Sequence, residues 1–385
     1  MNRTRTSLSA CIQKRPGKAL SPSKPTNNRL NHELQILQNV PLAPFTTLKI
    51  GGNARYFIRA ENEQQVAAAV GFANRNALEL FILGGGSNIL IADAGFNGIV
   101  LQICISGIEI SKSQISNLKS GIEGNEARLL TVGAGEDWDK FVEYCVKNKL
   151  AGVECLSGIP GFVGGTPVQN VGAYGQEVGD IITEVRCFDR TNGEIVTLSN
   201  AECGFSYRTS IFNSIHRDRF VVISVTFKLQ SNCDPKVVYK DLIDYFADKT
   251  PSLGDVRDAV LKIRRLKSMV IDDADPNAKS AGSFFKNPVV SPQKLEEIKS
   301  LFESVPSFEH GDKFKIAAAW LIEQSGFHKG FKLGRAGISS RHTLALINAG
   351  DATAADIIAL KEKIQQTVTA KFGIELQPEP VFVGF

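Results

Sequence analysis

The stretch at positions 158–175, GIPGFVGGTPVQNVGAYG, constrains the fold more than any other part of the chain. Glycine and proline are so frequent there that regular structure is not expected to run through it, so the stretch predicts a long, shaped loop. A second glycine-rich segment, FILGGGSNIL at 81–90, places three glycines directly after an apolar run. Because glycine lets a ligand approach the main chain closely, this segment predicts either a cradle of backbone N–H groups for an anion or a tight turn.

Neither segment matches the common phosphate-binding fingerprints. A P-loop requires G-x-x-x-x-G-K-[ST], and the dinucleotide fingerprint requires an amphipathic helix directly after its glycines. The pair Gly133 and Gly135 also fails, because Trp138 stands where the third glycine belongs. If the first segment holds an anion, the loop amides from Gly84 to Ser87 would bind it, and two such loops suit a diphosphate better than a single phosphate; a purely structural turn remains the alternative.

The order of predicted elements indicates a mixed α/β first domain that closes near residue 230. Strands and helices are expected at 54–58, 62–77, 78–83, 98–104, 127–132 and 137–148. Beyond the long loop, strands are expected at 183–188, 194–198 and 220–229, and Asn192-Gly193 predicts a hairpin turn.

Helical patterns predominate after residue 230. Ser291 as N-cap and Pro292 as first residue predict the start of one helix, and Thr353 followed by Asp356 predicts the start of a long one. Further helices are expected at 255–267 and 316–324, the Pro292 helix is expected to reach 303, and short strands are expected at 343–347 and 381–383.

The composition is that of an ordinary globular protein. Of its 385 residues, 43% are hydrophobic and 22% are charged, and the chain is long enough for two or three domains. A bilayer span needs about 18 apolar residues in a row, and no such run occurs. The N-terminus also lacks the apolar core of a secretory signal, so we expect a soluble protein that does not associate with membranes.

The cysteine and histidine spacings predict neither a disulfide framework nor a metal site. The seven cysteines include no C-x-x-C pair, and none of the five histidines belongs to a known ligand spacing. We expect free thiols in a reducing compartment.

The excess positive charge lies at the N-terminus. The net charge is +4, and the residues before the first acidic residue, Glu33, include the basic residues Arg3, Arg5, Lys14, Arg15, Lys18, Lys24 and Arg29. Such a segment is typical of an organelle-targeting peptide, a nucleic-acid tail or a disordered extension. We expect a disordered extension at 1–38, because no amphipathic apolar stripe is visible, and no nucleic-acid binding, because no aromatic platform accompanies the charge.

Five separated motifs resemble one enzyme family. They are Leu83 to Asn88, the loop at 158–175, YRTSIF at 207–212, AGSFFKNP at 281–288 and the pair Pro378-Glu379. From about residue 40 to the C-terminus, in this order, they resemble the UDP-N-acetylenolpyruvoylglucosamine reductase (MurB) family. Five motifs in register are far more specific than one glycine cluster.

The resemblance implies an α/β (α+β) fold in two domains. A two-lobed FAD-binding domain of the PCMH or vanillyl-alcohol-oxidase type would occupy 39–230, and a smaller α/β substrate-binding domain would occupy 231–385. The implied activity is an NADPH-dependent reduction of UDP-N-acetylglucosamine enolpyruvate to UDP-N-acetylmuramate, in peptidoglycan synthesis and thus in cell-wall biogenesis, cell shape and cell division. FAD would be bound non-covalently, NADPH would be the co-substrate, and the protein would be a cytoplasmic monomer.

The resemblance also implies the residues that bind FAD. The diphosphate is assigned to the first glycine segment, through Leu83, Gly84, Gly85, Gly86, Ser87 and Asn88. The rest of the flavin site is assigned to Pro160, Gly161, Gly165, Thr166, Pro167, Asn170, Gly172, Ala173 and Tyr174.

Three further residues match the family's catalytic positions. Arg208 suits the stabilisation of an enolate and its carboxylate, because a guanidinium stays charged and can fork onto a carboxylate. Glu379 would be a second stabiliser, either protonated or acting through Arg208 or water. Ser283 would donate the proton to C2, with a neighbour such as Lys286 restoring it.

The substrate's UDP end is assigned to four side chains. Tyr239 resembles the substrate-covering tyrosine of members that carry an extra loop, and Lys267 and Asn287 match positions that contact the diphosphate. His342 is expected near them.

Two other functions are consistent with the glycine loops. One is a flavin oxidase or dehydrogenase for another small substrate, which covalent flavin attachment would favour, but neither loop contains His or Cys. The other is a catalytically silent nucleotide-binding module, against which the joint presence of Arg208, Ser283 and Glu379 argues.

Overall fold

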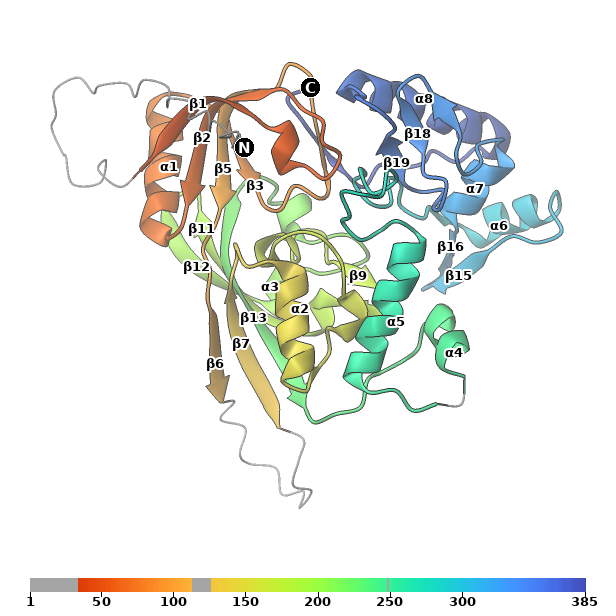
Figure 1. Cartoon of the computed structure of the whole chain (residues 1–385), viewed down its shortest axis with the longest axis horizontal. Coiled ribbons are helices and arrows are strands. Elements are labelled where there is room, and N and C mark those ends of the chain that lie inside the picture. The colour runs from red at the N-terminus through yellow and green to blue at the C-terminus, as the bar shows by residue number, and fades with distance from the viewer. Residues whose placement is uncertain (1–33, 113–125, 248) are drawn as a thin grey trace, which may run out of the picture. The chain divides into compact units, whose positions relative to one another are not determined.

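A four-stranded sheet carries the first glycine segment at the end of one of its strands. The computed structural model describes residues 34–112, 126–247 and 249–385, so residues 1–33 of the predicted extension at 1–38 lie outside the described residues. At its other end the prediction of disorder was wrong, because residues 36–38 belong to the strand Ile36–Pro41 and pair with the next strand. The sheet has the order β1-β2-β5-β3, with β1 antiparallel to β2 and the other pairs parallel (Figure 1). Its strands are β1 (Ile36–Pro41), β2 (Asn53–Ala60), β3 (Leu80–Leu83) and β5 (Phe96–Ile103).

Helix α1 (Glu63–Arg75) connects β2 to β3. The Asn62 side chain caps its start by accepting a hydrogen bond from the backbone N–H of Gln65. Its buried residues, Val66, Ala69, Val70 and Ala73, recur at helical spacing and face the sheet. The predicted helix and strand are thus confirmed, and β3 leads directly into Gly84.

A second, antiparallel sheet follows, in the order β12-β11-β13-β7-β6, with β8 paired to β13. Its strands are β6 (Ile108–Lys112), β7 (Ala127–Gly133), β8 (Leu150–Ala151), β11 (Ile182–Asp189), β12 (Glu194–Ser199) and β13 (Phe220–Ser231). The hairpin predicted at Asn192-Gly193 joins β11 to β12, with Gly193 at a φ of 78°. Helix α2 (Trp138–Lys147) lies between β7 and β8 in the chain.

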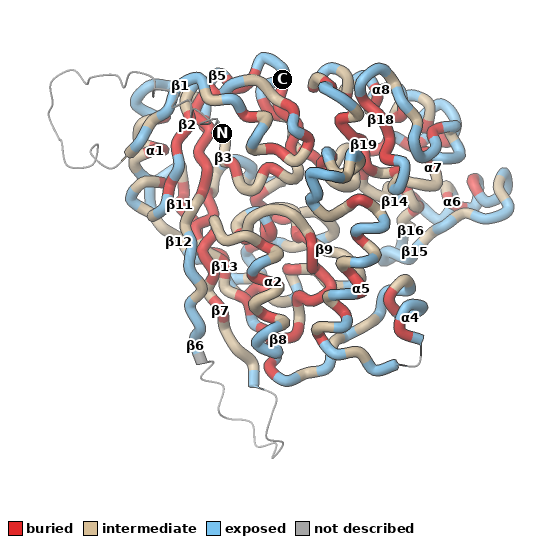
Figure 2. The backbone as a smooth tube through the Cα atoms, in the orientation of Figure 1, coloured by how far each residue is buried: buried red, intermediate tan, exposed pale blue. Residues whose placement is uncertain are grey.

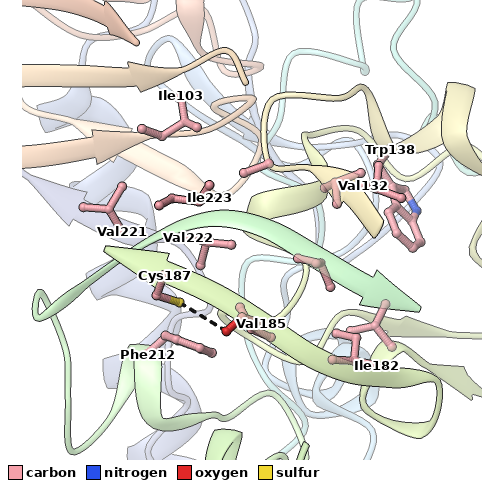
Figure 3. Close-up of a cluster of buried hydrophobic side chains, with 14 of the residues drawn as sticks. Ile103, Val132, Trp138, Ile182, Val185, Cys187, Phe212, Val221, Val222 and Ile223 are labelled. Carbon is pink, nitrogen blue, oxygen red and sulfur yellow. Dashed lines mark hydrogen bonds between the residues drawn. The ribbon is translucent and has the colours of Figure 1, made fainter. Parts of the chain in front are cut away.

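One hydrophobic core unites the two sheets. Figure 2 shows buried residues along the strands of both sheets, and Figure 3 shows Ile103 of β5 in the same cluster as Val132, Val185 and Ile223 of the second sheet. The Trp138 indole packs into this core and donates a hydrogen bond from Nε1 to the carbonyl of Leu156, 3.1 Å away. The core therefore anchors the start of the second glycine loop.

The second glycine loop contains little regular structure, as predicted. Between residues 158 and 175 there are a 3-10 turn at Val163–Gly165 and a two-residue strand, β9 (Gly172–Ala173), which pairs with β10 (Gln176–Glu177).

The C-terminal part has its own core and two small sheets. One sheet has the order β14-β16-β15 and the other β17-β18-β19. The strands are β14 (Val289–Val290), β15 (Ser307–His310), β16 (Lys313–Ile316), β17 (Lys332–Leu333), β18 (Ala336–Ile338) and β19 (Leu346–Asn348). The helices are α4 (Lys240–Phe246), α5 (Leu253–Leu266), α6 (Pro292–Lys299), α7 (Ala318–Gln324) and α8 (Ala354–Phe372), after the short α3 (Asn200–Cys203) of the preceding part.

The end of the chain returns to the first glycine segment. Strand β20 (Val381–Val383) pairs in parallel with β4 (Ile89–Ile91), which directly follows Asn88. This pairing brings Glu379 beside the loop at 84–88.

Three predicted boundaries were wrong because tertiary pairing overrides local pattern. Ile316 belongs to β16, where it pairs with Ser307, so α7 begins at Ala318 rather than at 316. Helix α6 ends at Lys299 instead of 303. The strand expected at 343–347 begins only at Leu346, because a turn joins the N–H of Ala345 to the carbonyl of His342.

No helix within the described ranges is long and apolar enough to cross a membrane. In the same ranges, no group of three or more His, Cys, Asp or Glu side chains is arranged to hold a metal ion. The six cysteines of the described residues are free thiols, and Cys11 lies outside those residues.

Candidate active site

A cavity of about 1050 Å³ brings the predicted site residues together. Segments from both glycine loops, from YRTSIF, from α5 and from the C-terminal part line it. Among the described residues, every predicted site residue lines the cavity except Pro167 and Asn170. The sequence motifs therefore converge on one place although more than 290 positions separate Leu83 from Glu379.

The two glycine loops pack directly against each other. A Cβ on Gly85 would lie 2.5 Å from the Cα of Gly161, and the Ser87 hydroxyl donates a hydrogen bond to the carbonyl of Pro160 over 2.8 Å. Gly86 has a φ of +65°, and a Cβ there would lie 1.8 Å from the carbonyl oxygen of Phe45. Glycine is required at these positions by close approach of the main chain.

Other glycines face open space. Within the described part of the chain, and apart from the two adjacent residues, no atom lies within 4 Å of where a Cβ on Gly84 or Gly165 would stand. Both residues line the cavity, so the missing side chains leave bare main chain beside room for a ligand.

Asn88 connects three segments of the site. Its Nδ2 donates to the Gln169 Oε1 at 2.6 Å and to the carbonyl of Glu379 at 3.3 Å. The Glu379 N–H in turn donates to the carbonyl of Phe284, next to Ser283, over 2.9 Å. These hydrogen bonds to the main chain of Glu379 thus fix its position relative to both the glycine loop and the Ser283 segment.

Asn170 and Pro167 lie behind the cavity wall. The Asn170 amide nitrogen donates to the Glu177 carboxylate and to the carbonyl of Ser206, and its oxygen accepts from the Gly179 N–H. Asn170 is buried and has a φ of +46°, a conformation that asparagine tolerates. In this structure these two residues shape the loop rather than line the cavity.

Arg208 is held by main-chain oxygens and by one carboxylate. Its Nη2 donates to the carbonyl of Gly172 at 2.5 Å, and its Nε lies 3.5 Å from Oε1 of Glu379. Its φ of +54° costs about 1–2 kcal/mol in a residue with a side chain. The Asn213 amide supports this conformation by donating to the Arg208 carbonyl.

The environment of Glu379 favours its protonated form more than water does. Burial raises the pKa of this carboxyl, while the nearby Arg208 and Lys286 lower it, and the net direction is upward. A carboxyl of this kind can donate as well as accept a hydrogen bond.

Ser283 lies within hydrogen-bond distance of His342. Its Oγ is 3.3 Å from the His342 Nε2, and the direction of the hydrogen bond depends on the tautomer of the ring. Burial, together with the charges of Lys267, Lys329 and Arg264, lowers the pKa of His342 to about 4. The imidazole is therefore neutral at pH 7 and can accept a proton from the serine hydroxyl or orient it.

We call Arg208, Ser283, His342 and Glu379 the buried end of the cavity. The exposed end consists of Tyr174, Tyr239 and Lys267, with Asp241 paired to Lys267 just outside the lining. The rings of Tyr174 and Tyr239 meet edge to face with centroids 5.4 Å apart, and the Lys267 Nζ lies 3.0 Å from the Asp241 Oδ2. Both members of this ion pair are well exposed, with side chains 38% and 41% accessible.

Asn287 has a structural contact besides its place in the cavity wall. Its Oδ1 accepts a hydrogen bond from the N–H of Ala318 at the start of α7. Ala317, the N-cap residue of that helix, has no side-chain oxygen that could accept this hydrogen bond. Asn287 therefore caps α7 from a distant segment.

Sequence reasoning missed Tyr207 and Arg264. The Tyr207 ring lies in the cavity wall between the Lys315 ammonium, 3.7 Å from its centroid, and the Arg208 guanidinium, 5.3 Å away. Arg264 lies on the buried face of α5, four residues after the buried Val260. A charged residue on the apolar face of a predicted helix is unusual, and this was the signal in the sequence that could have identified it.

Comparisons with known proteins give a consistent result. A family model described as "UDP-N-acetylenolpyruvoylglucosamine reductase, C-terminal domain" matches residues 275–383, and one described as "FAD binding domain" matches residues 54–199. The chain is 44% identical over 360 residues to the UDP-N-acetylenolpyruvoylglucosamine reductase of Thermobifida fusca, covering 90% of this chain and 98% of that protein. It is 41% identical to the enzyme of the same name from Streptomyces avermitilis, covering 94% and 99%.

A solved structure also matches over most of its length. The crystal structure of UDP-N-acetylenolpyruvylglucosamine reductase (MurB) from Thermus caldophilus is similar with a TM-score of 0.60 and 25% sequence identity, covering 91% of this chain and 99% of that one.

Proposed function

This chain belongs to the UDP-N-acetylenolpyruvoylglucosamine reductase (MurB) family, and from that premise we propose how its residues carry out the reaction. It is an FAD-dependent oxidoreductase that uses NADPH to reduce UDP-N-acetylglucosamine enolpyruvate to UDP-N-acetylmuramate for peptidoglycan synthesis. One observation carries the assignment of roles: Arg208, Ser283 and Glu379, from three distant segments, line the same cavity as both glycine loops.

The residues present fit a bound dinucleotide. Gly84 and Gly165 leave open space above the main chain, and the loop at 84–88 offers the N–H groups that a diphosphate needs. When bound, FAD accepts two electrons from NADPH and passes them to the carbon–carbon double bond of the substrate. Side chains of the protein stabilise the charge that then develops on the substrate and supply the proton.

Arg208 stabilises the negative charge that develops on the enolate and on its carboxylate. Its guanidinium is already oriented by the carbonyl of Gly172 and by Glu379, so little reorganisation accompanies the reaction. Burial raises the pKa of Glu379, which supports a role for its protonated form as a second hydrogen-bond donor to the enolate, beside a role through Arg208.

Ser283 donates the proton from its Oγ to C2. The neutral His342, 3.3 Å away through Nε2, orients the hydroxyl and conducts a proton to the serine oxygen after turnover. The contact with Ser283 supports a role for His342 in the proton path, in addition to the place near the UDP end that the sequence predicted.

The UDP end of the substrate binds at the exposed end of the cavity. Lys267 and Asn287 contact the diphosphate, and Tyr239 covers the substrate from the start of α4. We further propose that residues 39–230 form the FAD-binding domain and residues 231–385 the substrate-binding domain. The largest core draws only on residues before 230, which supports this division, whereas the core of residues 281–376 also includes Leu48, Ile50 and Leu90, and α4 and α5 share a small core with Cys155. We also propose that the protein is cytoplasmic, since its substrate is a nucleotide sugar, and that it acts as a monomer.

An anaerobic stopped-flow experiment tests the function. Purified protein that releases FAD on denaturation is mixed first with NADPH and then with UDP-N-acetylglucosamine enolpyruvate. We expect the flavin absorbance to bleach in the first step and to recover in the second. A colourless protein that cannot be reconstituted with FAD, or bleached flavin that the enolpyruvyl substrate does not reoxidise, would contradict the proposal.

A further inference from the structure

A loop from the first part of the chain is buried in the core of the C-terminal part. This loop, residues 46–50, lies between β1 and β2 and follows the 3-10 turn Ala43–Phe45. Leu48 and Ile50 are buried in a hydrophobic cluster whose other members, apart from Leu90, come from residues 281–376. The 46–50 loop therefore joins two regions that are far apart in the sequence.

The 46–50 loop holds the first glycine segment through main-chain contacts. The N–H of Thr47 donates a hydrogen bond to the carbonyl of Gly86 at 3.1 Å. The carbonyl oxygen of Phe45, just before the loop, lies so close to Gly86 that a Cβ there would be 1.8 Å away. These contacts fix the segment that we propose binds the FAD diphosphate.

The side chain of Thr47 holds the segment that leads to Ser283. Its hydroxyl donates a hydrogen bond to the carbonyl of Ser280 at 2.6 Å, across 233 positions of the sequence. Directly after Ser280 the chain turns at Gly282, which has a φ of +75° and donates its N–H to the Ser280 Oγ at 3.3 Å. The place of Ser280 therefore determines where this turn presents Ser283.

Asn348 supports both partners of this hydrogen bond. Its Nδ2 donates to the carbonyl of Leu48 at 3.2 Å, and its N–H donates to the carbonyl of Lys279 at 3.0 Å. Asn348 is 7% exposed and Ser280 is 6% exposed, so these bonds are shielded from water. The bond from Thr47 to Ser280 is thus part of a network that leaves either partner little freedom to move.

The position of Thr47 suits a role in catalysis without contact to the reacting atoms. Thr47 lines the cavity and is bonded to both segments that must be aligned there, the flavin loop and the Ser283 turn. The hydride comes from the flavin and the proton from Ser283, and both must reach one double bond. A displacement of 1 Å caused by a residue outside the reaction can slow a step by about 100-fold.

We propose that Thr47 is a positioning residue, whose hydroxyl fixes the Ser283 turn relative to the loop that holds the flavin. The inference rests on the proposed function, because it assumes FAD in this cavity and Ser283 as the proton donor. Thr47 acts through Ser283, so it serves the second half-reaction, in which the substrate is reduced, and not the first.

Anaerobic half-reactions test this selectivity. Thr47→Val removes the hydroxyl and nearly keeps the shape of the side chain. Flavin reduction by NADPH should stay within about twofold of wild type, whereas the maximal rate of reoxidation by UDP-N-acetylglucosamine enolpyruvate should fall by about 10- to 100-fold. Thr47→Ser, which restores the hydroxyl, should reoxidise within about threefold of wild type. As the matched control, Thr183→Val removes a hydroxyl bond to the carbonyl of Thr226 in the second sheet and should leave both rates unchanged.

A double variant shows whether Thr47 acts through Ser283. In a Ser283→Ala background, Thr47→Val should slow reoxidation no further, because the group that Thr47 positions is already absent. General damage to the site would not depend on the Ser283 hydroxyl, so it would slow the double variant beyond Ser283→Ala alone. Such additive slowing would overturn the proposal.

Thur remaining outcomes are also decisive. If Thr47→Val does not retain FAD, Thr47→Cys takes its place, and its weaker donor should slow reoxidation by at least about threefold. Reoxidation of Thr47→Cys at the wild-type rate would overturn the proposal. Equal slowing of both half-reactions, or loss of FAD from both variants, would mean that the hydroxyl serves the flavin site itself, and would overturn it too.

Failure of this inference is distinguishable from failure of the proposed function. If the wild-type protein completes both half-reactions and Thr47→Val matches it in both, only the inference about Thr47 fails. Wild-type flavin that NADPH does not reduce, or that the enolpyruvyl substrate does not reoxidise, would instead contradict the proposed function.

Discussion

The two ends of the cavity are constructed by different means. At the buried end, Arg208 and Glu379 are oriented largely by main-chain groups, and their side chains are 19% and 16% exposed. At the exposed end, Lys267 and Asp241 are about twice as exposed and hold each other through side chains alone. Groups that stabilise charge in a reaction need fixed positions, whereas groups that admit a large substrate need freedom to move. The predictions below ask whether the two ends respond as differently as their construction implies.

The largest effect is expected where the main chain is most crowded. Gly86→Ala places a Cβ 1.8 Å from the Phe45 carbonyl at a positive φ, so the loop must shift. We expect destabilisation by about 4 kcal/mol or more and loss of FAD, measured by urea unfolding and flavin absorbance.

Gly84→Ala is the matched control in the same loop. Its methyl group would enter open space in the cavity, so the free energy of unfolding of the FAD-free protein should stay within about 0.5 kcal/mol of wild type. FAD affinity should nevertheless fall by about 10- to 100-fold, because the added methyl group overpacks the loop against the ligand. Equal stability of the two variants would show that the crowding at Gly86 is not a constraint.

At the buried end, Arg208→Lys should lower kcat by about 100- to 1000-fold with a small change in KM, because a point charge cannot reproduce the oriented fork. Lys267→Arg at the exposed end should change mainly KM. Steady-state kinetics of both variants make the comparison, and unchanged turnover in Arg208→Lys would remove that residue from the reaction.

His342 makes the buried end sensitive to acid. Its pKa is about 4 in the folded protein and about 6.5 in an unfolded chain, so between these values only the unfolded state takes up the proton. Stability should therefore fall as the pH drops from 6.5 towards 4, by up to about 3 kcal/mol from this residue. Unfolding of wild type and His342→Gln across this range isolates the contribution, and parallel curves would refute it.

The smallest effect is expected at the exposed end. Asp241→Asn releases Lys267 and removes a carboxylate that repels the substrate diphosphate, so KM should fall by about two- to fivefold, in keeping with the modest strength of exposed ion pairs. Asp244→Asn, on the same helix and exposed, should leave KM unchanged. A higher KM in Asp241→Asn would mean that the ion pair supports the binding site.

The sequence predicted the parts of the site that depend on local patterns, and it did not predict the contacts between distant segments. The glycine loops were identified because glycine preferences are local, and the five motifs identified the family and about half of the residues that line the cavity. The contact between Ser283 and His342 joins residues 59 positions apart, and no local pattern carries it. Asn170 was assigned to the cofactor with its motif, although its side chain points into the loop that it supports. Arg264 was missed because its neighbour in space, Asp139, lies on another helix.

The most direct test of the account is the separation of the two half-reactions in Ser283→Ala. Mixed anaerobically with NADPH, this variant should reduce its flavin at a rate within about twofold of wild type, because no proton from Ser283 is needed. Reoxidation by UDP-N-acetylglucosamine enolpyruvate should be slower by about 100- to 10,000-fold, as expected when a proton donor is lost. Equal slowing of both steps, or reoxidation at the wild-type rate, would contradict the assignment of Ser283 and with it the catalytic role of the buried end.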